Sequence, residues 1–185
     1  MKKFSLYVVA LGVLVGAGVA YAAASPSAKL QKQDRLYGGG QFGPGCFTPT
    51  LCFAAPRNTS VDAHAEADGA EAVGNSNYGT PGVIENTRSV MCLRVEANRA
   101  AIGGVITAGN NAGFGFVQYF VDRGGTGLGP RDLASPSFVD VLSSPDWPAG
   151  FPQVCPSPTT GFPGAEPVFL PLEFGDVVVQ DATDD

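Results

Sequence analysis

The sequence contains few residues of the kinds that most enzyme sites use. His64 is its single histidine, so a Ser-His-Asp triad would have to include it, and no G-x-S-x-G motif supplies the nucleophile. No two cysteines have C-x-x-C spacing, and one histidine is too few for the usual zinc sites. We therefore expect neither a serine hydrolase triad nor a zinc site.

Phosphate-binding motifs are also missing. The glycine-rich residues 123–130 (RGGTGLGP) fit neither G-x-G-x-x-G nor a P-loop, since no lysine follows them and no helix is expected to begin there. Gly38, Gly39 and Gly40 are better explained by a β-bulge or a close approach of backbone. We predict no cofactor.

Basic residues are scarce, with 11 Lys and Arg against 17 Asp and Glu. Residues 1–24 hold two of the basic residues and none of the acidic ones, so the rest of the chain has a net charge of 9 − 17 = −8. Phosphate binding needs clustered Lys and Arg, which makes nucleic acid an improbable partner. We expect the acidity to serve solubility.

Only one long apolar run is present, at residues 4–20, between two lysines and a group of small residues. This pattern is typical of a secretory signal peptide, which we assign to residues 1–24, with cleavage after Ala22 or Ala24. An uncleaved anchor is the alternative, because the run approaches the ~20 residues that span a bilayer. We expect a secreted or cell-envelope protein without membrane contact after cleavage.

The four cysteines, Cys46, Cys52, Cys92 and Cys155, all follow the signal peptide. An even number in an oxidising compartment predicts two disulfides. Among the three pairings we favour Cys46–Cys52 across a short turn and Cys92–Cys155 around a long loop, which would stabilise the fold by ~3–5 kcal/mol. The second bond would pin the longest expected loop, residues 132–167.

Alternation of apolar and polar residues predicts strands, and no stretch sustains a helical period. The strands are expected at residues 59–67, 89–96, 100–107, 113–122, 168–174 and 176–180. Ala97 and Asn98 would form a hairpin turn, asparagine tolerating a positive φ, and Pro171 favours an edge strand. After a spacer at residues 25–33, residues 34–185 should form a single antiparallel β-sandwich, with an open barrel as the alternative.

Short segments along this domain carry a resemblance. They are Asp34-Arg35, Gly38-Gly39-Gly40-Gln41-Phe42, residues 92–104, Val121-Asp122 and Gly175-Asp176-Val177-Val178-Val179. In this order they resemble uncharacterised secreted bacterial β-sandwich modules, which are found alone or at the ends of larger surface proteins. The resemblance covers residues 34–185 and departs from the pattern in the loop with Cys46 and Cys52. It implies a fold and an exported location, and nothing catalytic.

Polar side chains at alternate positions give the best ligand candidates. Asp62, His64 and Glu66 would lie on one strand face, ~6.5–7 Å apart, where they could share a cation. We expect a solvated face, with Asp68 beside them, and no metal. Asp122 and Asp140 could supply carboxylates for glycoside cleavage, but both are read as surface or turn acids.

Aromatic residues gather at one predicted strand and in the long loop. Packing in the core explains most of them, and a sugar-binding platform is the alternative; the residues are Phe114, Phe116, Tyr119, Phe120 and Trp147. The sequence thus favours a non-enzymatic structural or binding module. Its partner would be a cell-surface protein or polysaccharide. The alternatives are a secreted hydrolase with a carboxylate site and a metal- or carbohydrate-binding module.

Overall fold

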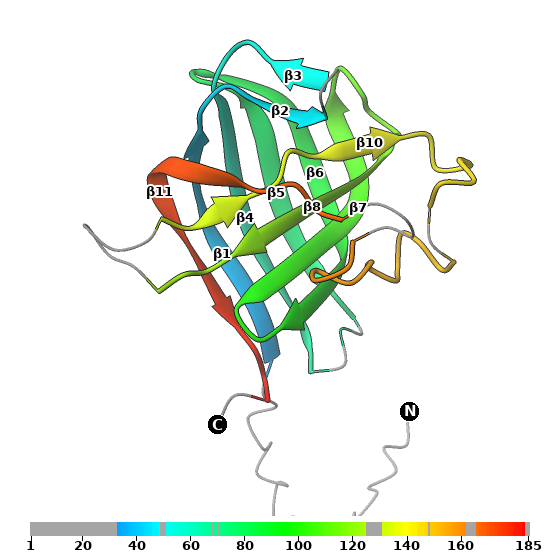
Figure 1. Cartoon of the computed structure of the whole chain (residues 1–185). Helices are drawn as coiled ribbons and strands as arrows, with labels where there is room; N and C mark the ends of the chain where they lie inside the picture. The colour runs from blue at the N-terminus through cyan, green and yellow to red at the C-terminus, as the bar shows by residue number, and fades with distance from the viewer. Residues whose placement is uncertain are drawn as a thin grey trace, which may run out of the picture.

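The computed structural model describes residues 33–48, 51–67, 69, 71–124, 131–147, 149–161 and 166–183. The expected signal peptide and its cleavage sites lie outside these residues, and so does Asp68. All regular elements within them are strands (Figure 1). They are β1 (Gln33–Phe42), β2 (Gly45–Thr48), β3 (Leu51–Phe53), β4 (Arg57–Glu66), β5 (Val73–Thr80), β6 (Val83–Glu96), β7 (Arg99–Gly109), β8 (Gly115–Val121), β9 (Leu133–Ala134), β10 (Phe138–Asp140) and β11 (Leu170–Gln180). Over the same ranges the chain forms no helix long and apolar enough to cross a bilayer.

The strands are antiparallel neighbours in one large sheet, and only β2 and β3 form a separate hairpin. The order is β10-β8-β7-β6-β5-β4-β1-β11-β9, and β9 also pairs with β8, so that the two ends of the order meet. In Figure 1, β8 and β10 cross in front of the strands at the back, which gives two facing layers. The expected all-β antiparallel architecture is confirmed, with both layers belonging to one continuous curved sheet.

The core lies between these layers and follows the alternation of the sequence. Val61, Ala63 and Ala65 of β4 are buried in it, together with Phe116 and Phe120 of β8. The opposite face of β8 belongs to a second, smaller cluster that contains Cys92, Ala101, Val117, Tyr119 and Cys155. Aromatic side chains at the expected strand are therefore packed on both of its faces.

A disulfide joins Cys92 to Cys155, as expected, across 63 residues of sequence. It fastens residues 149–161 to the outer face of β6, and it is compatible with an extracellular location. Cys46 and Cys52 stand opposite each other in the β2–β3 register. Cys52 is disulfide-bonded, but the side chain of Cys46 lies outside the described side chains, so their pairing stays a prediction.

The turn between β6 and β7 differs from the expected one. Ala97, and not Asn98, has the positive φ, of 53°. The side chain of Asn98 instead donates a hydrogen bond to the carbonyl of Asp122, and Asp181 accepts one from the backbone N–H of Ala97. Contacts from distant segments therefore decide the conformation of this turn.

The last strand is also different, because residues 168–174 and 176–180 do not form two strands. They form the single strand β11, which bends at Gly175, where φ is 99°. The expectation of an edge strand at Pro171 is wrong, since β11 lies between β1 and β9. Pro171 lies in the short stretch that pairs with β9.

The glycines of β1 permit close approach of the neighbouring backbones, as expected. At Gly39, with φ +151°, an added Cβ would lie 2.3 Å from the carbonyl oxygen of Thr59 on β4. At Gly40 it would lie 2.1 Å from that of Phe174 on β11. The central strand of this face is therefore bare of side chains where its neighbours come closest.

Candidate functional site

The candidate metal ligands Asp62, His64 and Glu66 lie on β4, where we expected a solvated face. Asp62 and His64 are exposed, and Glu66 is half-buried at the end of the strand. Within the described ranges no three His, Cys, Asp or Glu residues are grouped so that they could hold a metal ion. Asp62 and His64 instead border a hollow of about 590 Å³ that Arg35 and Tyr37 of β1 also line.

A second hollow, of about 520 Å³, continues along the same strand. The two share Gly38, and the second extends over Gly39 and Gly40 to Gln41 and Phe174. We call the two hollows together the β1 groove. Its floor is the glycine backbone of β1, and β4 and β11 form its sides.

Two exposed aromatic rings stand along the β1 groove. Tyr37 is 42% exposed. Phe174 is 70% exposed, the highest value for a large hydrophobic side chain among the described residues. Phe174 is opposite Gln41 in the register, four residues along β1 from Tyr37. At the ~3.3 Å rise per strand residue, the two rings are about 13 Å apart along the strand.

Polar side chains that donate and accept hydrogen bonds surround these rings. Asn58 and Ser60 lie beside the second hollow. The carboxamide of Asn77 on β5 donates to the hydroxyl of Ser60, at 3.4 Å. Carboxamides and hydroxyls both donate and accept, so the β1 groove combines two exposed rings with neutral polar groups at one end and with Arg35 and Asp62 at the other.

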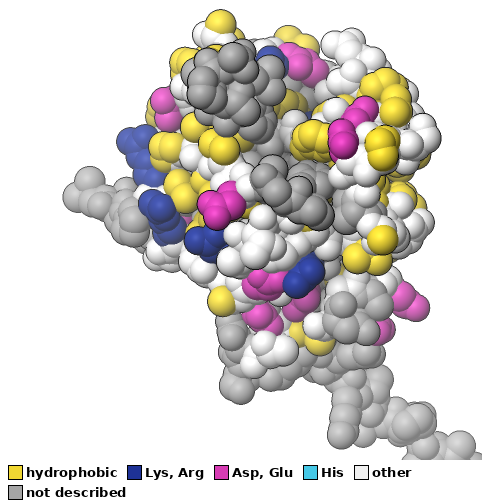
Figure 2. Space-filling model, turned by 45° about the vertical axis from the view of Figure 1, so that its right-hand side comes forward, with side chains coloured by type: hydrophobic (Ala, Val, Ile, Leu, Met, Phe, Trp, Pro, Cys, Tyr) yellow, Lys and Arg dark blue, Asp and Glu magenta, His cyan; other side chains and the backbone are white. Residues whose placement is uncertain are grey.

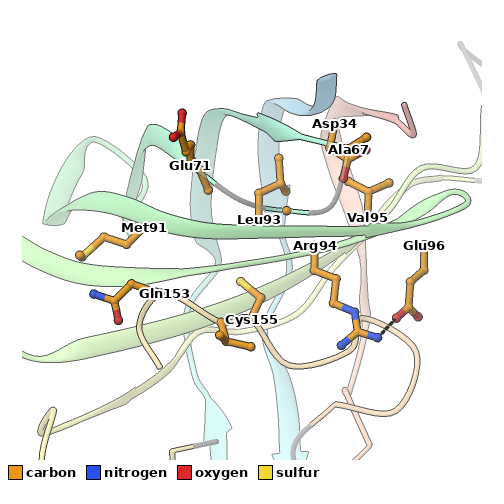
Figure 3. Close-up of a pocket in the computed structure, with 13 residues that line it drawn as sticks. Asp34, Ala67, Glu71, Met91, Leu93, Arg94, Val95, Glu96, Gln153 and Cys155 are labelled. Carbon is orange, nitrogen blue, oxygen red and sulfur yellow. Dashed lines mark ion pairs between the residues drawn. The ribbon is translucent and has the colours of Figure 1, made fainter. Parts of the chain in front are cut away.

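A larger hollow than either of these, of about 750 Å³, lies at the end of β6 (Figure 3). β5 pairs with β6 only as far as Val90, whereas β7 follows β6 to Glu96, so the hollow fills the place that a longer β5 would occupy. Leu93 and Val95 point to one side of β6, and Arg94 points to the other (Figure 3). The loop after β4 partly covers this edge, since an added Cβ at Gly69 would lie 2.8 Å from the carbonyl oxygen of Leu93.

Hydrogen bonds around Glu96 hold the wall of this hollow in place. Glu96 accepts hydrogen bonds from the hydroxyls of Ser157 and Thr159, at 3.0 and 2.7 Å, and forms an ion pair with Arg94 at 2.7 Å. Burial opposes its ionisation, but the hydrogen bonds from Thr159 and Ser157 and the charge of Arg94 outweigh this and lower the pKa of Glu96. The carboxylate thus fastens the disulfide-bonded segment to β6.

The carboxylates considered for glycoside cleavage bind backbone groups. Asp122 accepts hydrogen bonds from the N–H groups of Gly124 and Val179, and Asp140 accepts one from Val141. This is the expected behaviour of turn acids. Their carboxylate oxygens hold loops and strand ends in place.

A closer pair of carboxyl groups was not anticipated. Asp132 is buried and accepts hydrogen bonds from the N–H groups of Arg123 and Val177. Asp176 is exposed and follows Gly175 on β11. Hydrogen bonding with Asp132, a partial loss of solvation and the charges of Asp132 and Asp122 raise the pKa of Asp176.

The aromatic residues expected in a core or a platform are not gathered on one surface. Phe116, Phe120 and Tyr119 are buried, which confirms the core interpretation for them. Trp147 stacks on Phe151 at 4.0 Å between ring centroids, over the second cluster. Figure 2 shows hydrophobic side chains in several separate groups among acidic and basic ones.

The exposed rings of the β1 groove were missed by the sequence analysis. No strand was expected at residues 33–42, and β11 was divided in two, so nothing placed Tyr37 and Phe174 on one face. A usable signal was present, because Arg35, Tyr37 and Gln41 alternate with Leu36 and Phe42 around the glycines.

The comparisons add no relative to this description. The chain matches no protein-family model, and no curated protein or solved structure is significantly similar to it.

Proposed function

We propose that this chain is an exported, non-enzymatic module that binds a neutral polysaccharide along the β1 groove. The observation that supports the ligand class is the pair of exposed rings, Tyr37 and Phe174, on a glycine floor bordered by carboxamides and hydroxyls. Aromatic rings pack against the C–H faces of sugars, while neutral polar groups exchange hydrogen bonds with their hydroxyls.

The shape of the groove favours a polymer over a single sugar. The rings lie about 13 Å apart along the strand, a separation that one sugar ring does not span and an oligosaccharide does. The long, open floor also suits an extended chain that continues at both ends. A neutral polymer suits it better than a charged one, because Arg35 and Asp62 both border the groove with opposite charges, and the net charge of −6 on the whole chain disfavours an anionic polymer.

Export rests on the sequence. The tripartite pattern of residues 1–24 and the resemblance to secreted bacterial β-sandwich modules support a location at the cell surface or in the extracellular space. The Cys92–Cys155 bond is compatible with that location. Polysaccharides are abundant there, so the proposed ligand and the proposed location agree.

The test is binding of the purified protein to insoluble cellulose, chitin and xylan, measured by depletion from solution. We expect Tyr37→Ala and Phe174→Ala each to weaken binding about tenfold, which corresponds to ~1.4 kcal/mol. Phe114→Ala is the matched control, because Phe114 is also a partly exposed aromatic residue, 37% accessible, but lies outside the groove. Equal loss in all three variants, or no binding to any of the polymers, would contradict the proposal.

The same polymers separate the proposal from its alternative, a secreted hydrolase with a carboxylate site. Release of reducing ends from a polymer during incubation would identify a hydrolase. Binding without release is the expected result.

A further inference from the structure

An arginine lies in the core with no carboxylate partner among the described residues. Arg88 of β6 is 0% exposed and is the largest fully buried side chain of the described residues. It points to the same side of β6 as Val90, into the interior of the curved sheet. Burial lowers the pKa of Arg88 to about 10, so the guanidinium remains charged at neutral pH.

Its surroundings fix the guanidinium in one orientation. The ring of Tyr78 lies 4.5 Å from its central carbon and the ring of Phe116 lies 4.8 Å from it, which are favourable cation–π distances. Nη1 donates to the side-chain oxygen of Gln118 at 3.2 Å. Gln118 in turn accepts from Thr59 and donates to the carbonyl of Ser135, so its own hydrogen bonds are made.

The remaining edge of the guanidinium has no partner. Nε and Nη2 of Arg88 are buried without a hydrogen bond, and so is the hydroxyl of Ser76. Ser76 is 1% exposed and stands directly opposite Arg88 in the β5–β6 register. Nε and Nη2 form the side-on fork with which arginine binds two acceptor positions at once. Three unsatisfied polar atoms thus belong to two facing residues of the interior.

Leaving these atoms unpaired is costly. Each buried unsatisfied group costs about 1–3 kcal/mol, and more when it is charged, which together rivals the ~5–15 kcal/mol stability of a whole domain. A water molecule could accept from the fork, but it would leave the buried positive charge without compensation. An anion accepts from the fork and the hydroxyl and supplies the missing charge.

We propose that Arg88 and Ser76 form an interior binding site for one small monovalent anion such as chloride or formate. This site is separate from the β1 groove and does not depend on the polysaccharide proposal. Its role is structural, because the anion completes the core as the sheet closes. The folded protein would therefore bind one such anion that the unfolded chain does not bind.

Urea unfolding of the whole purified protein tests this at constant ionic strength, with chloride replacing gluconate, a much larger anion. Binding of one anion to the folded state raises the folding equilibrium constant in proportion to free anion above its dissociation constant. We expect a tenfold increase in chloride to raise that constant about tenfold. The same dependence should be absent in Arg88→Met and weakened in Ser76→Ala. The exposed Arg94→Lys should retain it.

Crystals grown in bromide give a readout that does not require any variant to fold. Anomalous scattering should place one bromide within hydrogen-bonding distance of Nε and Nη2 of Arg88 and of the hydroxyl of Ser76. Water alone at this position, or a stability that does not change between chloride and gluconate, would overturn the proposal.

Discussion

Removing the Cys92–Cys155 bond should destabilise the fold mainly by freeing the unfolded chain. The bond closes a loop across 63 residues. The chain-entropy relation, −2.1 − 1.5R ln n, gives a loss of about 4 kcal/mol at 25 °C for a loop of this length. Both sulfurs are buried in the second cluster, so replacement by alanine also removes a small amount of packing.

The measurement is urea unfolding of Cys92→Ala/Cys155→Ala beside the parent protein. Besides the loss of about 4 kcal/mol, we expect a larger m-value, since the unlinked unfolded chain exposes more surface. The melting temperature should fall by roughly 8–16 °C, at ~2–4 °C for each kcal/mol in a domain of this size. A loss below about 1 kcal/mol with an unchanged m-value would refute the loop-closure reasoning.

Two further predictions concern β1 and its neighbour β11. Gly39→Ala should cost about 3 kcal/mol or more, because its Cβ would lie 2.3 Å from the carbonyl oxygen of Thr59. The matched control is Gly82→Ala, where φ is +80° and an added Cβ would meet no atom within 4 Å. It should cost only the ~1–2 kcal/mol of a left-handed backbone conformation. Similar losses of the two variants in urea unfolding would show that the close approach of the strands is not the cause. Asp176→Asn should raise the melting temperature at pH 7 but not at pH 3. The pKa of Asp176 is raised in the folded state, so its stabilising contribution is complete at low pH and is lost as the pH rises through that pKa. The control is Glu173→Gln on the same strand. An equal gain in melting temperature at both pH values would contradict the assignment.

Local alternation was enough to predict the strands with the clearest patterns. In β4, Val61 and Ala63 are buried while Asp62 and His64 are exposed, as the polar and apolar positions indicated. The same holds for β8, whose two faces belong to two different clusters. β4 packs one face against the core, so its sequence records the side on which the core lies, whereas β8 is buried on both faces.

Other strands were hidden because long-range pairing decides them. β5 reads VGNSNYGT, with glycine and asparagine at positions that favour turns, yet β4 and β6 hold it in the sheet from both sides. The glycines of β1 lack a side chain, which lowers their strand propensity. The same lack of a side chain lets β4 and β11 come close. β5 could not be identified without knowing its neighbours, and in β1 the alternation on either side of the glycines was the remaining signal.

The candidate site suffered from the same limitation. Asp62 and His64 were correctly placed on a solvated face, but their neighbours Arg35 and Tyr37 belong to a strand that was not expected. Arg88 did carry a signal, because it lies two residues before the buried Val90 and therefore on the same strand face. A charged residue at a buried strand position is rare and can therefore be recognised from the pattern. Only the three-dimensional contacts show which of its atoms lack a hydrogen-bond partner.

The pairing of β1 with β11 joins the first and last described strands of the chain. A ribosome therefore delivers β11 only after all the strands that lie between it and β1 in the sequence, and until then the nascent chain exposes an unpaired edge of β1. Contacts between residues far apart in sequence are also slow to form. A chaperone thus has the time needed to synthesise these strands in which to hold the polypeptide before its sheet can close.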